Sequence, residues 1–287
     1  RRAGSDRRVN YMLGILLAGI SSAFDELADS IGKRKISDGR ESYYTFGFLT
    51  QFVSALSITA IGFLFADLRF SLESLPTFIP RVLVSILMMQ LAVIAMTKVD
   101  RGSFGFIRLA TLPILLVTDI LLGYSISSIQ AFGIILIIIP IGILFYSDLS
   151  KMKGMLLALL VAVLAAISIS LFKYDISHFN SVESEQAITS LFISLYFFLT
   201  ATLIRGENPL AFLREKIYMV QTGSSGIAYI VNSFAYLYAP ASVITTAFRG
   251  FSVLFSIIAG TFYFNERGFF LRGLLFVVIL TGLLLLI

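Results

Sequence analysis

The chain has 287 residues, of which 57% are hydrophobic and only 14% are charged, and its formal net charge is +5. Soluble domains average about 45–50% apolar and about 25% charged residues, so this composition indicates a membrane protein. Cysteine is absent, which excludes disulfides, thiolate metal sites and a cysteine nucleophile. We expect the excess of basic over acidic residues to reflect membrane orientation and contact with anionic lipids, with no nucleic acid as partner.

A charged arm, residues 1–9, precedes ten apolar stretches that are each long enough to cross about 30 Å of hydrocarbon as a helix. Runs such as IILIIIPIGILF do not alternate polar and apolar residues, so helices are predicted rather than barrel strands. We therefore predict an all-α membrane protein with ten transmembrane helices. The predicted spans are 10–32, 43–66, 75–98, 103–124, 128–147, 152–173, 184–204, 210–238, 241–264 and 269–287.

The two halves of the chain are related at an offset of 140 residues. Residues 14–33 align with residues 154–173 at six identical positions, and Arg108 aligns with Arg249 at an offset of 141. Each half holds five predicted helices, an odd number, so the second half enters the membrane from the opposite face. We predict two inverted five-helix repeats, 10–147 and 148–287, a design that recurs in secondary transporters.

The C-terminal segment FAYLYAPASVITTAFRGFSVLFSIIAGTFYFNERGFFLRGLLFVVILTGLLLL resembles the closing half-repeat of the drug/metabolite transporter superfamily, EamA-like branch. The resemblance rests on the YAPAS turn, on Arg249 with Ser252 three residues later, on Gly260, and on Asn265–Glu266 at the end of the ninth span. It implies ten helices, two five-helix repeats, a central cavity and alternating access. Substrates in that family include amino acids, sugars, nucleotides, choline-like cations and drugs.

Three acids, Asp25, Glu26 and Asp29, lie within the first predicted span, in SSAFDELADS. Asp25 and Asp29 are four residues apart and share a helix face, whereas Glu26 lies about 100° around the helix. One interpretation places them at a wetted helix end, paired with basic residues there or with a loop. The aligned positions of the second half are apolar, so the fold does not require acids there. We therefore favour Asp25 and Glu26 as substrate-binding residues, and all three as coupling or gating candidates.

Arg108 and Arg249 lie inside the fourth and ninth predicted spans at equivalent places. An intramembrane arginine usually faces a cavity or a partner, and its planar fork suits a carboxylate or phosphate. The alternative is a structural salt bridge to one of the first-span acids or to Asp119. Asp119 follows Arg108 by about three helical turns, so it is either a gating candidate or a residue at the helix end.

The eighth span contributes further candidates. Gln221 and Asn232 share one face, and Tyr229 lies between them. Gln90 in the third span is a weaker candidate for substrate binding. The small residues of GSSG, 223–226, are interpreted as a surface for close helix packing.

An enzyme is not expected. The single histidine, His178, stands between predicted spans, and HExxH and Gly-rich phosphate loops are absent from the sequence. We therefore predict no catalytic residues, no cofactor and no metal.

These patterns predict a secondary transporter of a small polar or zwitterionic metabolite, with a proton as candidate coupling ion. The alternatives are a channel and a non-transporting lipid-handling or scaffold protein. The expected location is the plasma membrane of a bacterium or archaeon, as a monomer or homodimer. The positive-inside rule favours an N-terminus outside, whereas the family resemblance implies both termini inside.

Overall fold

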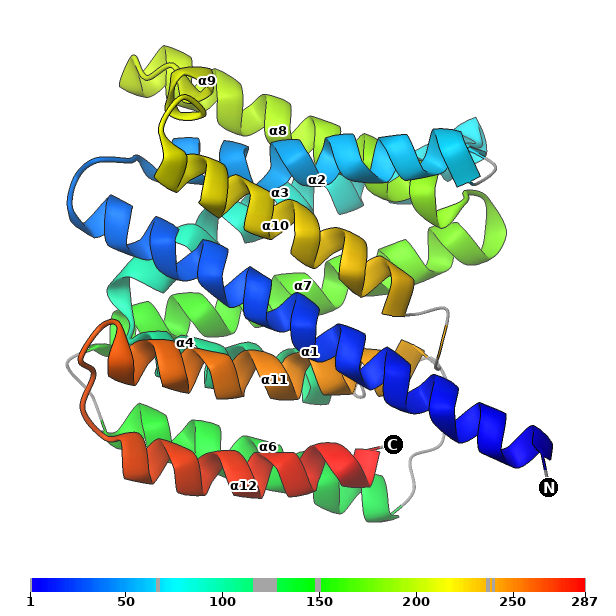
Figure 1. The fold of residues 1–287 in the computed structure, drawn as a ribbon, viewed down its shortest axis with the longest axis vertical. Helices are drawn as coiled ribbons and strands as arrows, with labels where there is room; N and C mark the ends of the chain where they lie inside the picture. The colour runs from blue at the N-terminus through cyan, green and yellow to red at the C-terminus, as the bar shows by residue number, and fades with distance from the viewer. Residues whose placement is uncertain are drawn as a thin grey trace.

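A computed structural model describes residues 2–65, 68–115, 128–147, 151–235, 238 and 241–286. Every regular element in these residues is helical, which confirms the all-α prediction for the described part of the chain (Figure 1). The elements are α1 (Arg2–Ser37), α2 (Tyr43–Phe65), the 3₁₀ turn η1 (Leu72–Ser74), α3 (Leu75–Lys98), α4 (Arg101–Arg108), α6 (Ser128–Ser147), α7 (Met152–His178), α8 (Val182–Arg205), α9 (Pro209–Phe212), α10 (Lys216–Ala235), α11 (Ala241–Phe262) and α12 (Phe269–Leu286).

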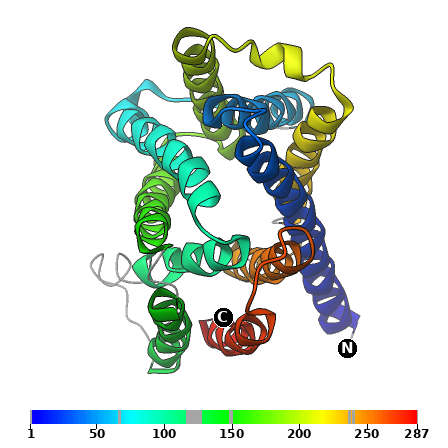
Figure 2. The ribbon, with the colours of Figure 1, turned by 90° about the vertical axis from the view of Figure 1, so that its left-hand side faces the viewer.

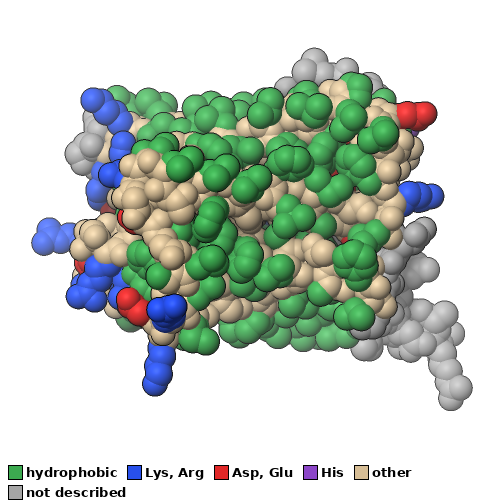
Figure 3. All heavy atoms as spheres, turned by 90° about the horizontal axis from the view of Figure 1, so that it is seen from above, with side chains coloured by type: hydrophobic (Ala, Val, Ile, Leu, Met, Phe, Trp, Pro, Cys, Tyr) green, Lys and Arg blue, Asp and Glu red, His purple; other side chains and the backbone are tan. Residues whose placement is uncertain are grey.

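Six helices of the described residues are long and apolar enough to cross a membrane: Tyr11–Ser37, Tyr43–Leu64, Leu72–Lys98, Met152–His178, Val182–Arg205 and Ile244–Phe262. Two shorter apolar helices, Ala131–Leu144 and Phe269–Leu285, lie beside them. Large apolar side chains such as Leu83 and Phe63 point outward and form a broad apolar belt (Figure 3). A water-soluble protein would not expose apolar surface on this scale.

The helices run back and forth, so their connections gather at two ends of the bundle (Figure 1). We call one of them the basic end, because exposed Lys and Arg side chains gather there (Figure 3). It carries the connections 38–42, 99–100, 206–215 and 263–268, and the opposite end carries 68–74 and 179–181. The exposed basic residues of the basic end are Arg34, Arg40, Lys98, Lys153, Arg205, Arg214, Lys216 and Arg267.

Helix packing brings distant parts of the chain together, as Figure 2 shows in a view along the helices. Helix α1 packs against α10 and α11, and α7 packs against α3 and α4. The remaining large interfaces join α2 to α8, α6 to α12, α2 to α10 and α4 to α11.

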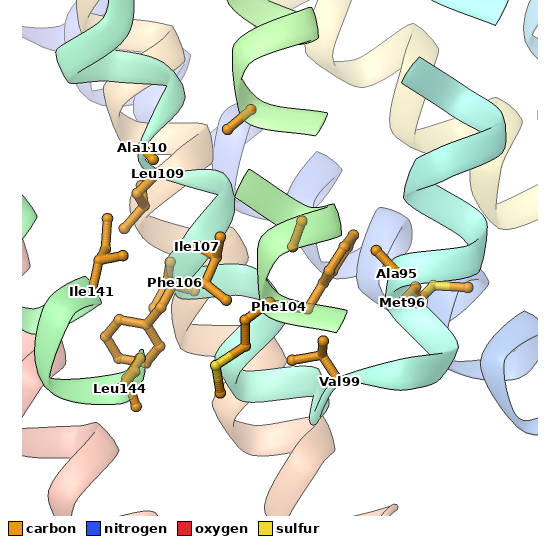
Figure 4. Close-up of a cluster of buried hydrophobic side chains, with 14 of the residues drawn as sticks. Ala95, Met96, Val99, Phe104, Phe106, Ile107, Leu109, Ala110, Ile141 and Leu144 are labelled. Atoms are coloured by element: carbon orange, nitrogen blue, oxygen red, sulfur yellow. The ribbon is translucent and has the colours of Figure 1, made fainter. Parts of the chain in front are cut away.

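A buried apolar cluster holds α4 in place between its neighbours (Figure 4). Phe104, Phe106 and Ile107 of α4 pack with Met96 of α3 and Ile141 of α6. Because α4 carries Arg101 at its first residue and Arg108 at its last, this cluster fixes the positions of two cations.

Glycines allow the closest helix contacts. A Cβ atom on Gly47 of α2 would lie 2.6 Å from the ring of Phe197 in α8, and that ring is fully buried. In α6, a Cβ atom on Gly142 would have no neighbour within 4 Å. The α2–α8 interface therefore requires glycine, as expected for close packing in membranes.

We predict that Gly47→Ala lowers the unfolding free energy by about 1–3 kcal/mol, because the Phe197 ring has no room to move away. The measurement is thermal or denaturant unfolding of purified protein. Gly142→Ala is the matched control and should leave stability unchanged or slightly raise it, since alanine favours helix. Equal effects of the two substitutions would contradict the steric explanation.

Candidate functional site

A central cavity of about 270 Å³ lies among α1, α2, α3, α4, α7 and α11. Four charged residues line it: Asp25 and Asp29 of α1, Arg108 of α4 and Arg249 of α11. The structure thus brings together both arginines and two of the three acids that the sequence singled out. A partly buried cavity lined by both signs of charge fits a ligand that carries both signs as well.

The rest of the cavity wall is mostly apolar. Met88, Met89 and Met96 of α3 form one part of it, and methionine adapts to ligands of different shape. Phe104 contributes an aromatic face, and the guanidinium groups of Arg101 and Arg108 lie 5.5 and 5.6 Å from its ring centroid. A wall of this kind buries the apolar body of a ligand and leaves orientation to the few charges.

Glu26 is bound by a cation that the sequence analysis did not select. Arg101 donates from Nε and Nη2 to the two Glu26 oxygens at 2.6 and 2.9 Å, and Ser30 adds a hydrogen bond at 2.9 Å. Arg101 Nη2 also donates to Asp29 at 2.5 Å, and Asp29 lies 3.9 Å from Arg108. Arg101 is 2% exposed, so the guanidinium group at the centre of this arrangement is buried, whereas Asp29 and Arg108 are partly exposed and line the cavity.

Asp25 differs from its two neighbours. Among the residues that the structure describes, nothing forms a hydrogen bond or salt bridge with its carboxylate, although Arg108 and Arg101 are close enough to act on it electrostatically. It is half-buried and faces the cavity. Asp25 is therefore the acid best placed to meet a ligand, whereas Glu26 is occupied by Arg101.

A network of charges continues from Arg101 to the surface of the basic end. Glu266 accepts hydrogen bonds from the backbone N–H groups of Arg101 and Gly102 and so caps the N-terminus of α4. Arg272 donates to Glu266 at 2.7 Å, and Lys33 lies 3.6 Å from the same carboxylate. These contacts tie α1, α4 and α12 together.

Asp100 anchors the outer part of this network. Arg272 donates to it at 2.6 Å and Lys151 at 2.7 Å. Burial opposes ionisation, but these two hydrogen bonds outweigh it and lower the pKa of Asp100 below its ordinary value. Asp100 is therefore ionised at neutral pH and links α12 to Lys151 at the basic end.

A second polar network lies toward the opposite end. Arg81 of α3 donates to Glu185 of α8 at 2.5 Å and to Thr189 at 2.9 Å. Asn180 also donates to Glu185, and Asp175 of α7 accepts a hydrogen bond from Thr77. The cavity thus lies between two layers of buried charge, one toward each end.

The other predicted candidates do not line the cavity. Gln90 accepts a hydrogen bond from Tyr196, and Tyr229 faces Ser190 and Arg81. Asn232 Oδ1 is buried and has no hydrogen-bond partner among the described residues. Gln221 donates to Glu41 at 3.0 Å, near the basic end. Asp119 lies outside the described residues.

Sequence reasoning missed Arg101, Glu266, Arg81 and Glu185. Arg101 lies outside the predicted span 103–124, because it precedes the apolar run of its helix. The signal that could have found it is the charge pair of KVDRGS, which stands directly at a helix start.

The apolar belt, the spanning helices and the enclosed charges define a helical integral membrane protein. No protein-family model matches the chain, and no curated protein matches it.

Proposed function

We propose that this protein is a secondary transporter that carries a small polar or zwitterionic organic metabolite across the plasma membrane of a bacterium or archaeon, as a monomer or homodimer. The observation that carries this proposal is the cavity that Asp25, Arg108 and Arg249 line from three different helices. Its volume of about 270 Å³ is close to the lower end of small-molecule sites, roughly 300–1,000 Å³. A ligand the size of an amino acid fits that space.

The charges assign roles to the two ends of such a ligand. Arg108 and Arg249 would bind its anionic group, since a guanidinium fork matches a carboxylate or phosphate. Asp25 would bind an amine, because it has no salt bridge among the described residues. Asp29 is shared between Arg101 and Arg108, so it links ligand binding to the network of the basic end.

We further propose that the chain consists of ten transmembrane helices in two inverted five-helix repeats and belongs to the EamA-like branch of the drug/metabolite transporters. The packing supports this. When the halves are exchanged, the contacts of α1 with α10 and α11 become those of α7 with α3 and α4. The α2–α8, α6–α12 and α4–α11 interfaces each join a helix to its own counterpart.

Alternating access gives the two charged layers a function. Opening the basic end requires the separation of Arg101 from Glu26 and Asp29, and opening the opposite end requires the separation of Arg81 from Glu185. A ligand that competes for Arg108 would loosen the contact between Arg108 and Asp29 and so favour opening of the basic end. Binding energy at the cavity would in this way shift the population between the two states.

The test is a thermal-shift screen of purified protein against amino acids, choline-like amines, phosphosugars and nucleotides, followed by counterflow in proteoliposomes with the compounds that bind. We expect a ligand carrying both charges to stabilise the protein and to exchange with saturable kinetics. Non-saturating flux would favour a channel. The absence of any ligand and any flux would favour a lipid-handling or scaffold protein.

We predict that Arg249→Ala lowers substrate affinity by about ten- to hundredfold, because a charge-assisted hydrogen bond contributes about 1.5–3 kcal/mol. Arg249→Lys should recover only part of this loss, since lysine lacks the bidentate fork. The measurement is ligand titration followed by thermal shift, with counterflow as a second readout. Arg214→Ala, at an exposed arginine of the basic end, is the control and should bind like the wild type. Full recovery by lysine would argue against recognition by the fork.

A further inference from the structure

A carboxyl–amide pair near the basic end lies outside the cavity and takes no part in the charge networks. Glu41 stands in the connection between α1 and α2, and Gln221 stands in the second turn of α10. They are 4% and 0% exposed, respectively. Gln221 Nε2 donates to Glu41 Oε1 at 3.0 Å. This contact joins two elements that are 180 residues apart in the sequence.

The pair leaves two buried oxygen atoms without a donor. Glu41 Oε2 and Gln221 Oε1 are both enclosed, and neither accepts a hydrogen bond from any residue in the described part of the chain. An ionised carboxylate and an amide oxygen only accept hydrogen bonds, so neither can satisfy the other. Leaving such groups unpaired is unfavourable, because each loses its hydrogen bonds to water without gaining a partner in the protein.

A proton on Glu41 would supply the donor that both oxygens lack. Protonated at Oε2, the carboxyl group would donate to Gln221 Oε1 while its Oε1 still accepts from Gln221 Nε2, so that two hydrogen bonds would join the pair. We propose that Glu41 and Gln221 form a proton-binding site in which Glu41 is protonated in this arrangement of the helices.

The surroundings favour the neutral form of Glu41. Burial is the main cause that raises its pKa to about 8, and the Glu207 carboxylate adds to it, whereas the Gln221 hydrogen bond and Lys35 oppose it. Glu207 itself receives hydrogen bonds from Ser42 and Thr45. Tyr218 lies close enough to Glu41 for the two to interact electrostatically, and Arg40, Glu207 and Glu215 act on Tyr218 as well.

In the other half of the chain, a buried carboxylate is paired with a cation. Arg81 precedes Gln221 by 140 residues, the offset that aligns the two halves. Arg81 neutralises buried Glu185 with a salt bridge of 2.5 Å. An amide at the corresponding place offers Glu41 a hydrogen bond but no positive charge. A buried carboxyl group without a cation is more stable when it is protonated.

If the protein is the proposed transporter, this site couples a proton to the transport cycle. Opening the basic end would separate the 38–42 connection from α10 and expose Glu41 to water, where its pKa returns toward the ordinary 4.5. The proton would leave to solvent on opening and return on closing. This coupling step rests on the proposed function, whereas the proton site itself does not.

The test compares the pH dependence of the melting temperature in wild type and in Glu41→Gln. The folded form holds a proton on Glu41 up to a pH of about 8, and the unfolded chain only up to about 4.5. The contribution of Glu41 to stability is therefore complete below the lower value and is lost as pH rises toward the higher one. Glu41→Gln imitates the protonated form, so it should match wild type near pH ~5 and melt about 4 °C higher or more near pH ~9.

Glu215→Gln is the matched control, because it neutralises an exposed carboxylate near the same helix start and should keep the wild-type pH dependence. Gln221→Arg is a second variant, which should remove the loss of stability at high pH by holding Glu41 ionised. Parallel pH profiles of wild type and Glu41→Gln would overturn the proposal. A sodium effect would also overturn it. If replacing choline chloride with sodium chloride raised the melting temperature of the wild type but not that of Glu41→Gln, the site would hold a metal cation.

Transport is measured separately, as substrate uptake driven by a pH gradient in proteoliposomes. Glu41→Gln is expected to keep counterflow, but its gradient-driven accumulation of substrate should fall by at least about tenfold. Suppose that the wild type shows no transport while Glu41→Gln still removes the pH dependence of the melting temperature. That result would support the proton site and count against the proposed function. Full gradient-driven accumulation by Glu41→Gln would overturn the coupling step.

Discussion

Arg101→Gln is expected to lower the unfolding free energy by about 3–5 kcal/mol, because it leaves the buried Glu26 and Asp29 carboxylates without their shared cation. Arg101 contacts both acids at 2.5–2.9 Å and is 2% exposed. Its removal also weakens the link between α1 and α4, since the guanidinium group makes the shortest of the ion pairs that bridge them. The measurement is unfolding of purified protein in detergent by denaturant, with the yield of folded protein as a second readout.

A double substitution separates the loss of the pair from the presence of a lone charge. Glu26→Gln combined with Arg101→Gln should recover a large part of the loss, since no unpaired Glu26 charge remains. Arg34→Gln is the control, because Arg34 forms an exposed pair with Asp38 at 3.5 Å. It should change stability by less than about 1 kcal/mol. If Arg101→Gln also changed stability by less than about 1 kcal/mol, the paired charges around Arg101 would not be important for stability.

Asp25→Asn is expected to lower affinity for an amine-containing substrate by about ten- to hundredfold, because it removes the only charge assigned to the amine. Its melting temperature should stay the same or rise, since no salt bridge to a described residue is lost and a half-buried charge disappears. Binding is measured by ligand-dependent thermal shift and by counterflow.

Glu26→Gln is the comparison for this prediction, because it lies one residue away on the same helix. It should lower stability through the loss of a bidentate contact with Arg101 and should change affinity less than Asp25→Asn does. If Asp25→Asn instead lowered stability and spared binding, Asp25 would be structural, and the helix-end interpretation of the first-span acids would gain support.

Most helix positions could be predicted from the sequence. The third predicted span, 75–98, is found as Leu75–Lys98, and the fifth, 128–147, is found as Ser128–Ser147. These positions depend on the local hydropathy of about 20 consecutive residues, which the sequence contains in full. The number of spans and their inverted arrangement stay predictions.

Helix ends were less predictable where tertiary contacts set them. The helix expected at 152–173 continues to His178, where Asp175 accepts a hydrogen bond from Thr77 of α3. The helix expected to start at 210 begins at Lys216, because Asn208 caps the separate short helix α9. Polar residues at a span end do not show by themselves whether the helix continues.

The sequence by itself determined the helical membrane class and singled out Asp25, Asp29, Arg108 and Arg249 as candidates, which the structure then places around one cavity. Apolar runs that long form helices in lipid whatever surrounds them, and ionisable residues within them are costly enough to mark a functional place. Only the tertiary structure decided the partners of the charges. Glu26 meets Arg101 across 75 residues and Gln221 meets Glu41 across 180, because an ion pair or hydrogen bond depends on distances of about 3 Å that helix packing alone establishes.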